Sequence, residues 1–428
     1  METERKINSI LKDVLKKIQP PEKDLKIINN SLARFLIDVK KKIKNLKINA
    51  EIFVGGSFSK NTLIKKDVYD IDVFIRFEKN YKEISEITKK IIKGIKNPIT
   101  VHGSRDYFKI KVSPIAYIEL IPVIKINNPK DAENITDLSY SHVNYINKRI
   151  KKNKKILEDI MLAKAFCYAN NCYGAESYIS GFSGYGLELL VYHYGGFLRF
   201  IKEMVKIRKE KLIIDIEKQH KNKQDVFMNL NSSKLHSPII LIDPTYKQRN
   251  VLAALSDESF EKFKKVCAEF LRKPNLSFFE LKKPDIEKIK KYAKEKKYEF
   301  SIMKIETNRQ EGDIAGSKLL KFYKHIKNEI EKYFEIKKTG FEYTGKKIAD
   351  CFFVVKSKGE IFVSGPETKD KENVKSFKKI HKKNFVKKNR VYASEKVDFS
   401  LKEFIDRWKN KNREKLRDMS ISELSIKN

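Results

Sequence analysis

The most restrictive feature of the sequence is a pair of aspartates inside an apolar run. In 54-VGGSFSKNTLIKKDVYDIDVFIRF-77, Asp70 and Asp72 lie one residue apart among Ile, Val and Phe. Alternate residues of a strand point to the same face, so the two carboxylates project together while Ile71 and Val73 face the other way. Neighbouring carboxylates repel each other, and a divalent cation that bridges them relieves the repulsion. A solvated strand edge is the alternative explanation for the bare pair.

A third acid and a glycine-rich turn accompany this pair. Glu119 lies in a second apolar run, 118-IELIP-122, which we expect to form another strand. Three acids on neighbouring strands can bind two Mg²⁺ ions. One ion would activate a hydroxyl and the other would bind a triphosphate. Upstream, Gly56-Ser57 follows a predicted strand, and glycine lets the backbone approach a phosphate closely.

The charge of the chain indicates a polyanionic partner. The 428 residues include 92 Lys and Arg against 56 Asp and Glu, a formal net charge of +36. Such a surplus favours nucleic-acid binding. A compositional bias is the competing explanation, because Lys, Ile and Asn are abundant throughout and Lys far outnumbers Arg.

The remaining composition is that of a globular cytoplasmic protein. Apolar residues make up 41% of the chain, and no run of 18 or more of them occurs, so we predict no membrane span. The charged N-terminal stretch lacks the apolar region of a secretory signal. Four scattered cysteines do not form a paired zinc motif or a disulfide framework, and we expect reduced thiols: Cys167, Cys172, Cys267 and Cys351.

The pattern of apolar residues predicts an α+β fold with a mixed sheet. Helical spacing is expected over 1–45, 140–210 and 246–271. Strands are expected at 50–54, 70–77, 108–113, 117–126, 298–306, 350–357 and 360–365. The capping box Ser400-Leu-Lys-Glu403 predicts the start of the last helix.

The order of these features resembles a known signature. A strand, Gly-Ser, twelve residues and then apolar-Asp-apolar-Asp-apolar is similar to the polymerase-beta-like nucleotidyltransferase superfamily. Members of that superfamily join a nucleoside monophosphate to a hydroxyl and release pyrophosphate. The resemblance implies that Asp70, Asp72 and Glu119 are catalytic residues and ligands of two Mg²⁺ ions.

Three further stretches narrow the resemblance. They are 136-TDLSYSHVNYI-146, 173-YGAESYISGFSGYGLELLVYHYGGF-197 and 243-DPTYKQRNVLAALS-256. In order and spacing they resemble the archaeal (class I) CCA-adding enzymes, which are tRNA nucleotidyltransferases. The likeness is clear over about 50–260 and weaker beyond, where 365-GPETKDKENVKSF-377 resembles the C-terminal region of the family.

The resemblance implies a set of nucleotide-binding residues. These are Gly56, Ser57, Lys60, Lys164 and Tyr173 at the triphosphate, Ser139 and His142 near the ribose and phosphates, and Arg249 at the incoming base. Taken alone, several have plainer explanations. Lys164 suits a snorkelling lysine, His142 a helix-cap or packing histidine, Tyr173 a core residue, and Arg249 an intramolecular ion pair.

The sequence departs from the family pattern at a few positions. Lys60 stands where arginine is usual, which keeps the charge but gives up bidentate phosphate contact. Leu138 stands where a charged residue is common, so one polar contact near the ribose is missing. Asp70 and Glu119 each appear where the other acid is more frequent. None of these changes removes an essential charge.

The leading prediction is an enzyme that adds and repairs the 3′-terminal CCA of tRNA from CTP and ATP without a nucleic-acid template. Within the same fold the alternatives are a poly(A) polymerase and an oligoadenylate-synthesising enzyme, which share the carboxylates. An alternative of a different class is a catalytically idle RNA-binding protein. The presence of all three acids argues against an idle protein.

The predicted domains are a nucleotidyltransferase head or palm over 1–148, a helical neck over 149–260, and a basic C-terminal body and tail over 261–428. We expect the last region to grip the acceptor stem and elbow of tRNA by backbone shape. Within 377–390 the predicted phosphate contacts are Lys382, Lys383, Lys387 and Lys388; a solvated helix face is the alternative. The sequence leaves open whether the chain forms a homodimer and whether Mg²⁺ or Mn²⁺ is used.

Overall fold

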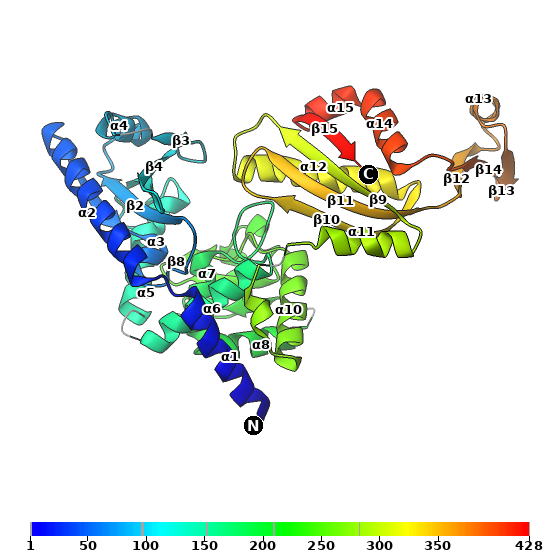
Figure 1. The fold of residues 1–428 in the computed structure, drawn as a ribbon. Helices are drawn as coiled ribbons and strands as arrows, with labels where there is room; N and C mark the ends of the chain where they lie inside the picture. Colours follow the sequence, from blue (N-terminus) through cyan, green and yellow to red (C-terminus); the bar gives the residue numbers. More distant parts are fainter. Residues whose placement is uncertain (1, 96–97, 151–152, 209, 282, 428) are drawn as a thin grey trace. The chain divides into compact units, whose positions relative to one another are not determined.

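The chain folds into two compact units, 1–282 and 283–428, each described here by itself. The computed structural model describes residues 2–95, 98–150, 153–208, 210–281 and 283–427 (Figure 1). No helix in these ranges combines the length and apolar character that crossing a bilayer requires. The predicted domain boundaries at 148 and 260 stay predictions.

The first unit contains a five-stranded mixed sheet, which agrees with the predicted α+β class. Its strand order is β1-β2-β5-β4-β3, and β2 and β5 run parallel while the other neighbours are antiparallel. The strands are β1 (Ala50–Val54), β2 (Tyr69–Phe77), β3 (Ile99–Val101), β4 (Tyr107–Ser113) and β5 (Ala116–Ile124). The predicted strands at 50–54, 70–77, 108–113 and 117–126 are therefore confirmed, with ends that differ by at most two residues.

One face of this sheet is apolar and covered by helices. Ile71, Val73 and Ile118 are at most 1% exposed and join a core with the apolar side of α2. The helices and short turns around the sheet are α2 (Glu22–Asn45), α3 (Gly56–Ser59), α4 (Ile84–Ile91), η1 (Pro129–Asp131) and η2 (Ile135–Leu138). The other face is left for the polar residues of the alternating strands.

The rest of the first unit is mainly helical. Its elements are α1 (Glu2–Ile18), α5 (Ser139–Ile150), α6 (Lys154–Ala169), α7 (Gly184–Tyr194), α8 (Phe197–Lys206), α9 (Lys223–Asn229), α10 (Asp257–Arg272), η3 (Ser232–Lys234) and η4 (Leu276–Phe279). A small sheet in the order β6-β7-β8 accompanies them: β6 (Leu212–Ile214), β7 (Ile239–Asp243) and β8 (Tyr246–Asn250).

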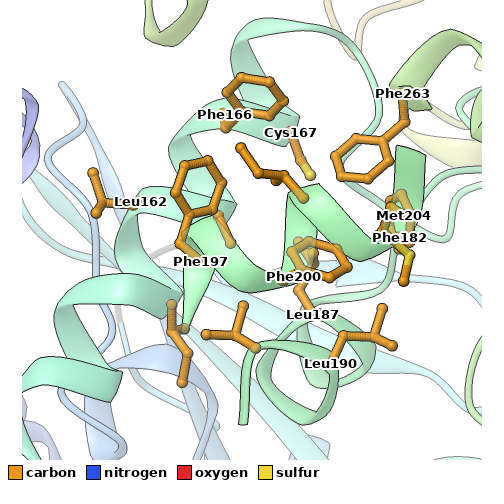
Figure 2. Packing of buried hydrophobic residues seen from close by; sticks show 14 of the residues in the cluster. Leu162, Phe166, Cys167, Phe182, Leu187, Leu190, Phe197, Phe200, Met204 and Phe263 are labelled. Atoms are coloured by element: carbon orange, nitrogen blue, oxygen red, sulfur yellow. The ribbon is translucent and has the colours of Figure 1, made fainter. Parts of the chain in front are cut away.

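An aromatic core holds these helices together. Phe166 on α6 packs edge-on against Phe197 on α8, with ring centroids 5.5 Å apart (Figure 2). The ring centroids of Phe182 and Phe263 lie 4.8 Å apart. All four rings are fully buried. Apolar residues of α1 belong to this core rather than to the sheet core. Aromatic burial of this size dominates the packing energy of such a bundle.

The second unit is built on a four-stranded antiparallel sheet in the order β10-β11-β9-β15. A smaller sheet, β12-β14-β13, is formed by the chain between β11 and α14. The strands are β9 (Glu299–Thr307), β10 (Phe334–Tyr343), β11 (Ile348–Ser357), β12 (Glu360–Glu367), β13 (Asn384–Lys387), β14 (Arg390–Lys396) and β15 (Ile421–Lys427). The helices are α11 (Ile286–Glu295), α12 (Asp313–Glu331), α13 (Lys371–Ile380), α14 (Leu401–Lys411) and α15 (Arg413–Asp418).

Most helix and strand predictions hold, with one clear error. The capping box at Ser400 and Glu403 is formed and starts α14, although the short helix α15 follows it. The helix predicted over 246–271 is wrong at its beginning. Residues Tyr246–Asn250 form β8, which pairs with β7, and the helix begins only after Ser256, whose side chain caps it. Pairing with the adjacent strand β7 overrides the local pattern there.

Candidate active site

The three predicted carboxylates share one face of the sheet. Asp72 on β2 lies directly opposite Glu119 on the parallel strand β5, and Asp70 lies two residues before Asp72. Lys109 comes from the neighbouring strand β4 and lies opposite Glu119. Its ammonium donates to Asp70 over 2.7 Å and to Glu119 over 3.5 Å. The structure therefore brings the three acids together, with one cation between two of them.

Burial raises the pKa of two of these acids. It raises the pKa of Asp72 to about 6, and the nearby Asp70 adds to the effect. Burial likewise raises the pKa of Glu119 to about 7, with further contributions from Asp72 and Asp70. Both shifts mean that negative charge at this place is costly in the isolated protein. A cation added there is favoured for the same reason.

Gly56 is pressed against the carboxylate of Asp72. Its φ is +60°, a left-handed conformation that glycine adopts without strain. A Cβ at this position would lie 1.7 Å from Oδ2 of Asp72, so no side chain fits. The amide of Gly55 donates to the carbonyl of Asp72 over 2.9 Å. The glycine turn and the carboxylate strand are thus packed as one piece, and Ser57 follows as the second residue of α3.

Two of the predicted phosphate-binding lysines meet at a buried glutamate. Glu188 on α7 accepts from Lys60 over 2.6 Å and from Lys164 on α6 over 2.8 Å. Lys164 also donates to the hydroxyl of Thr62 over 2.7 Å. All of these groups are buried. Two ammonium groups and one carboxylate leave one net positive charge inside the protein.

The electrostatics of this group follow from its burial. Burial alone would raise the pKa of Glu188, but Lys164 and Lys60 outweigh it and lower the pKa to about 2. Burial lowers the pKa of Lys60, and the charge of Glu188 opposes that shift. Asp72 also favours the charged form of Lys60. The buried lysine group is therefore electrostatically linked to the carboxylate site.

A second buried acid, Asp243, contacts two of the predicted nucleotide-binding residues, Arg249 and His142. Arg249 on β8 donates to Oδ2 of Asp243 over 2.6 Å, and Nε2 of His142 lies 2.8 Å from the same oxygen. The ring of His142 stacks on Tyr185 with a centroid distance of 4.2 Å. Hydrogen bonding to His142 and the charge of Arg249 hold the pKa of Asp243 well below its usual range despite burial. The ion pair considered for Arg249 is thus present.

The last two predicted residues are Tyr173, in the segment between α6 and α7, and Ser139, on α5. Tyr173 forms an isolated bridge with Phe182, and a Cβ on Gly184 would come within 2.9 Å of its hydroxyl. Burial raises the pKa of Tyr173, and the charges of Glu188 and Asp72 add to the shift. Tyr173 is therefore near both acids. Ser139 is the first residue of α5, one turn before His142.

The predicted RNA-binding lysines all belong to the second unit. Lys382 and Lys383 follow α13, and Lys387 and Lys388 lie at the end of β13. The side chains of all four are exposed. They are a solvent-facing set, in contrast to the buried lysines of the first unit.

Several residues with close contacts in this site were not singled out from the sequence. They include Thr62, Lys109, Tyr185, Glu188 and Asp243. Glu188 and Asp243 are acids inside apolar runs, 187-LELL-190 and 239-IILID-243, which is the same signal that drew attention to Asp72. The strand register would have brought Lys109 to Glu119 once β4 and β5 were paired. Tyr185 carried no signal beyond its place in a Gly- and Tyr-rich run.

The donor set fits a hard divalent cation. Carboxylate oxygens are the ligands that Mg²⁺ prefers, and burial raises the pKa values of Asp72 and Glu119, so a cation would stabilise their charged forms. Among the described residues, no three His, Cys, Asp or Glu side chains are arranged closely enough to enclose an ion. Lys109 explains part of this, because its ammonium already lies between Asp70 and Glu119.

Comparisons with known proteins define the class. A nucleotidyltransferase domain model matches residues 32–160, and a model described as tRNA nucleotidyltransferase, second domain, matches residues 158–280. The first match contains Asp70, Asp72 and Glu119, and the second contains Glu188 and Asp243. The matched domains and the fold are thus those of a nucleotidyltransferase.

Curated relatives identify the family within this class. A CCA-adding enzyme of Nanoarchaeum equitans is 37% identical over 286 residues, covering 66% of this chain and 67% of the relative. One from Methanocaldococcus jannaschii is 29% identical over 434 residues, covering 97% and 93%. One from Methanosarcina mazei is 30% identical over 364 residues, covering 81% and 75%. The chain belongs to the archaeal CCA-adding enzymes and is an enzyme.

Solved structures agree at the level of the fold. A cytoplasmic RNA terminal U-transferase superposes with a TM-score of 0.50 at 13% identity, covering 65% of this chain and 99% of the other. A poly(U) polymerase gives a TM-score of 0.50 at 14% identity with the same coverage. Nucleotidyltransferases of this kind use nucleotide substrates and divalent metal ions.

Proposed function

We propose that the chain restores the 3′-terminal CCA of tRNA from CTP and ATP by two-metal nucleotidyl transfer on the carboxylate face of its mixed sheet. The observation that carries the catalytic part is the register of β2 and β5, which sets Asp72 opposite Glu119 with Asp70 on the same face. Family membership supports the choice of tRNA and of the two nucleotides.

The three acids are the proposed holders of two Mg²⁺ ions. Bound there, the ions would make the 3′ hydroxyl of the tRNA a better nucleophile and neutralise the triphosphate. The reaction joins the 3′ oxygen to the α-phosphorus and breaks the bond between the α-phosphorus and the bridging oxygen, so pyrophosphate leaves. In the isolated protein, Lys109 supplies part of the positive charge that these acids require.

The buried lysine group is the proposed triphosphate site. Lys60 and Lys164 carry one positive charge beyond what Glu188 balances, and Lys60 is electrostatically linked to Asp72. An anion is the natural partner for that surplus. Ser57, in the glycine turn beside Asp72, and Tyr173, near Glu188, are proposed as further phosphate contacts.

The Asp243 group is the proposed base and ribose side of the nucleotide. Arg249 offers only hydrogen-bond donors, so it favours base edges with acceptors, such as O2 and N3 of cytosine or N1 of adenine. Asp243 fixes both Arg249 and His142 through one oxygen. Ser139, one turn before His142, is proposed to lie near the ribose.

A direct assay tests the proposed function. The full chain is incubated with tRNA ending before the first C, after the second C, or at the complete end, together with one labelled nucleotide. We expect CTP to be added to the first, ATP to the second, and nothing to the third. Long A tails, or addition of ATP to any RNA end, would favour a poly(A) polymerase instead.

A further inference from the structure

The small sheet of the second unit has one face that is aromatic and open to solvent. In the order β12-β14-β13, Phe385 pairs with Tyr392, and Phe362 lies opposite Ser394, two residues from Tyr392. Alternate residues share a face, so Phe362, Phe385 and Tyr392 all project from the same side. We call these three residues the aromatic face.

The three rings lie close together without being buried. The centroids of Phe385 and Tyr392 are 5.7 Å apart with nearly parallel planes, and those of Phe362 and Phe385 are 5.7 Å apart and perpendicular. Phe362 is 64% exposed and Phe385 is 41% exposed. A row of exposed aromatic rings is costly in water unless something covers it.

The opposite face of the same sheet is covered where β12 and β14 lie, although Val386 of β13 is exposed on it. Val391 and Ala393, which alternate with Tyr392, are fully buried. The ring of Phe377 from α13 lies so close to Gly365 on β12 that an added Cβ would meet it at 2.8 Å. The sheet thus has one face that is packed over two of its three strands and one face, the aromatic face, on which Phe362 and Phe385 are exposed.

The surroundings of the aromatic face are strongly basic. Residues 360–396 hold eleven Lys and Arg against five Asp and Glu, a surplus of six positive charges. Lys387 and Arg390 pair across β13 and β14 on the same face as Phe385 and Tyr392. Arg390 also contacts Glu367, at 3.8 Å, so only part of this charge is balanced locally. Aromatic rings within a basic rim are what nucleic-acid bases and phosphates bind together.

We propose that the aromatic face stacks on unpaired nucleobases in a loop of the tRNA substrate. The inference rests on the proposed function, and it changes the expectation that this region recognises only backbone shape. Exposed rings on a sheet bind splayed-out bases by stacking, whereas paired stems present mainly phosphate and ribose. Lys387 and Arg390 would then hold the flanking phosphates.

The first test separates stacking from charge by the salt dependence of tRNA affinity. We expect Phe385→Ala to weaken binding about tenfold without changing the slope of log affinity against log salt. Val386→Ala is the matched control, because Val386 is the next residue, is also exposed, and points to the opposite face. It should leave affinity unchanged. Equal behaviour of Phe385→Ala and Val386→Ala overturns the proposal.

Two further variants keep the test decisive if Phe385→Ala disturbs the sheet. Phe385→Trp retains a ring, so it should keep affinity, and its fluorescence should be quenched when tRNA is added. Phe385→Leu retains apolar bulk without a ring and should bind as weakly as Phe385→Ala. Full affinity of Phe385→Leu, or no quenching of Phe385→Trp, contradicts stacking.

The choice of RNA and the oligomeric state supply the remaining outcomes. On a two-stranded acceptor-stem duplex that has no loop, Phe385→Ala and the unaltered chain should bind equally. If sedimentation shows that Phe385→Ala breaks up a dimer while tRNA affinity is unchanged, the aromatic face joins copies of this chain and the proposal fails. If the unaltered chain adds CTP to truncated tRNA but Phe385→Ala leaves the KM for tRNA unchanged, only the stacking proposal fails.

Discussion

The two basic regions of the molecule handle charge in opposite ways. In the first unit, Lys60 and Lys164 are buried and share Glu188 through contacts of 2.6 and 2.8 Å. In the second unit, Lys382, Lys383 and their neighbours are exposed around the small sheet. Buried charges are screened little by salt, and exposed ones are screened strongly. The difference separates a site that holds one ligand in a fixed geometry from a surface that attracts a long polyanion.

The largest expected effect is at the carboxylates. We expect Asp72→Ala to lower the rate of nucleotide addition by more than roughly 100-fold. Loss of a group that only hydrogen-bonds to a metal ligand costs up to roughly 100-fold, and here a proposed ligand itself is removed. Burial raises the pKa of Asp72, so removing its charge should not destabilise the fold. Addition assays on truncated tRNA and a tRNA-binding measurement check both parts.

Asp67→Ala is the matched control for this change. Asp67 is an exposed acid three residues before Asp70 in the same segment. It should keep full activity. An Asp72→Ala protein with substantial activity would contradict the assignment of the carboxylate site.

The next effect concerns the buried lysine group. We expect Glu188→Gln to lower the free energy of unfolding by about 3–5 kcal/mol, because two ammonium groups lose their shared counter-charge. The KM for CTP should also change, since Lys60 and Lys164 lose their fixed positions. Glu203→Gln is the control: Glu203 pairs with Lys206 over 2.6 Å, but both side chains are exposed. Its effect should stay below about 1 kcal/mol.

The effect of Glu188→Gln on stability should depend on pH. The pKa of Glu188 is depressed from 4.5 to about 2, so its stabilisation is present above pH 4.5 and is lost as pH falls toward 2. The difference in unfolding free energy between the unaltered chain and Glu188→Gln should therefore shrink over that window. Denaturant titrations at several pH values measure it. A difference that is constant with pH would show that Glu188 is not charged in the folded protein.

A smaller effect is expected at Arg249. Arg249→Ala should lower the rates of CTP and ATP incorporation together by about tenfold. It should also reduce the ratio of each rate to the rate with UTP, because uracil presents a donor where cytosine presents an acceptor. Lys247→Ala changes an exposed cation on the same strand and should have no such effect. Unchanged nucleotide selection in Arg249→Ala would limit this arginine to its ion pair with Asp243.

The smallest effect on turnover is expected from the exposed lysines. We expect charge reversal to make the slope of log affinity for tRNA against log salt shallower, by about 0.9 for each phosphate that the variant no longer binds. Turnover at saturating tRNA should be unchanged. The variant carries Lys382→Glu, Lys383→Glu, Lys387→Glu and Lys388→Glu. The control reverses four exposed lysines of and after α11, namely Lys288, Lys291, Lys294 and Lys296. Equal slopes in the two variants would mean that net charge alone is responsible.

Local patterns predicted the part of the site that lies on strands. The alternation around Asp70 and Asp72 and the apolar run around Glu119 predicted one polar face, and the register confirms that face. The partners of Lys60 and His142 were beyond local reasoning. Lys60 and Glu188 are 128 residues apart in the chain, and His142 and Asp243 are 101 apart. Contacts of that range depend on how helices and sheets pack, which no short window reports.

The error at 246–256 has a shorter-range origin. The residues that begin β8 carry a pattern that also suits a helix. They form a strand because they pair with β7, an apolar strand that was not predicted. Asn250 completes the turn by accepting from the amides of Leu241 and Leu252 through its side chain. A side chain that bridges two backbone segments in this way leaves no periodic signal in the sequence.

The tight fit of Gly56 against Asp72 bears on which acids the site can exchange. The side chains of Asp70 and Glu119 are partly exposed, at 39% and 23%. Each has room for one methylene more or less. Position 72 has none, because the oxygen of its carboxylate already occupies the space where a Cβ of residue 56 would be. A longer acid at position 72 would therefore displace the glycine turn, whereas at positions 70 and 119 it could extend toward solvent.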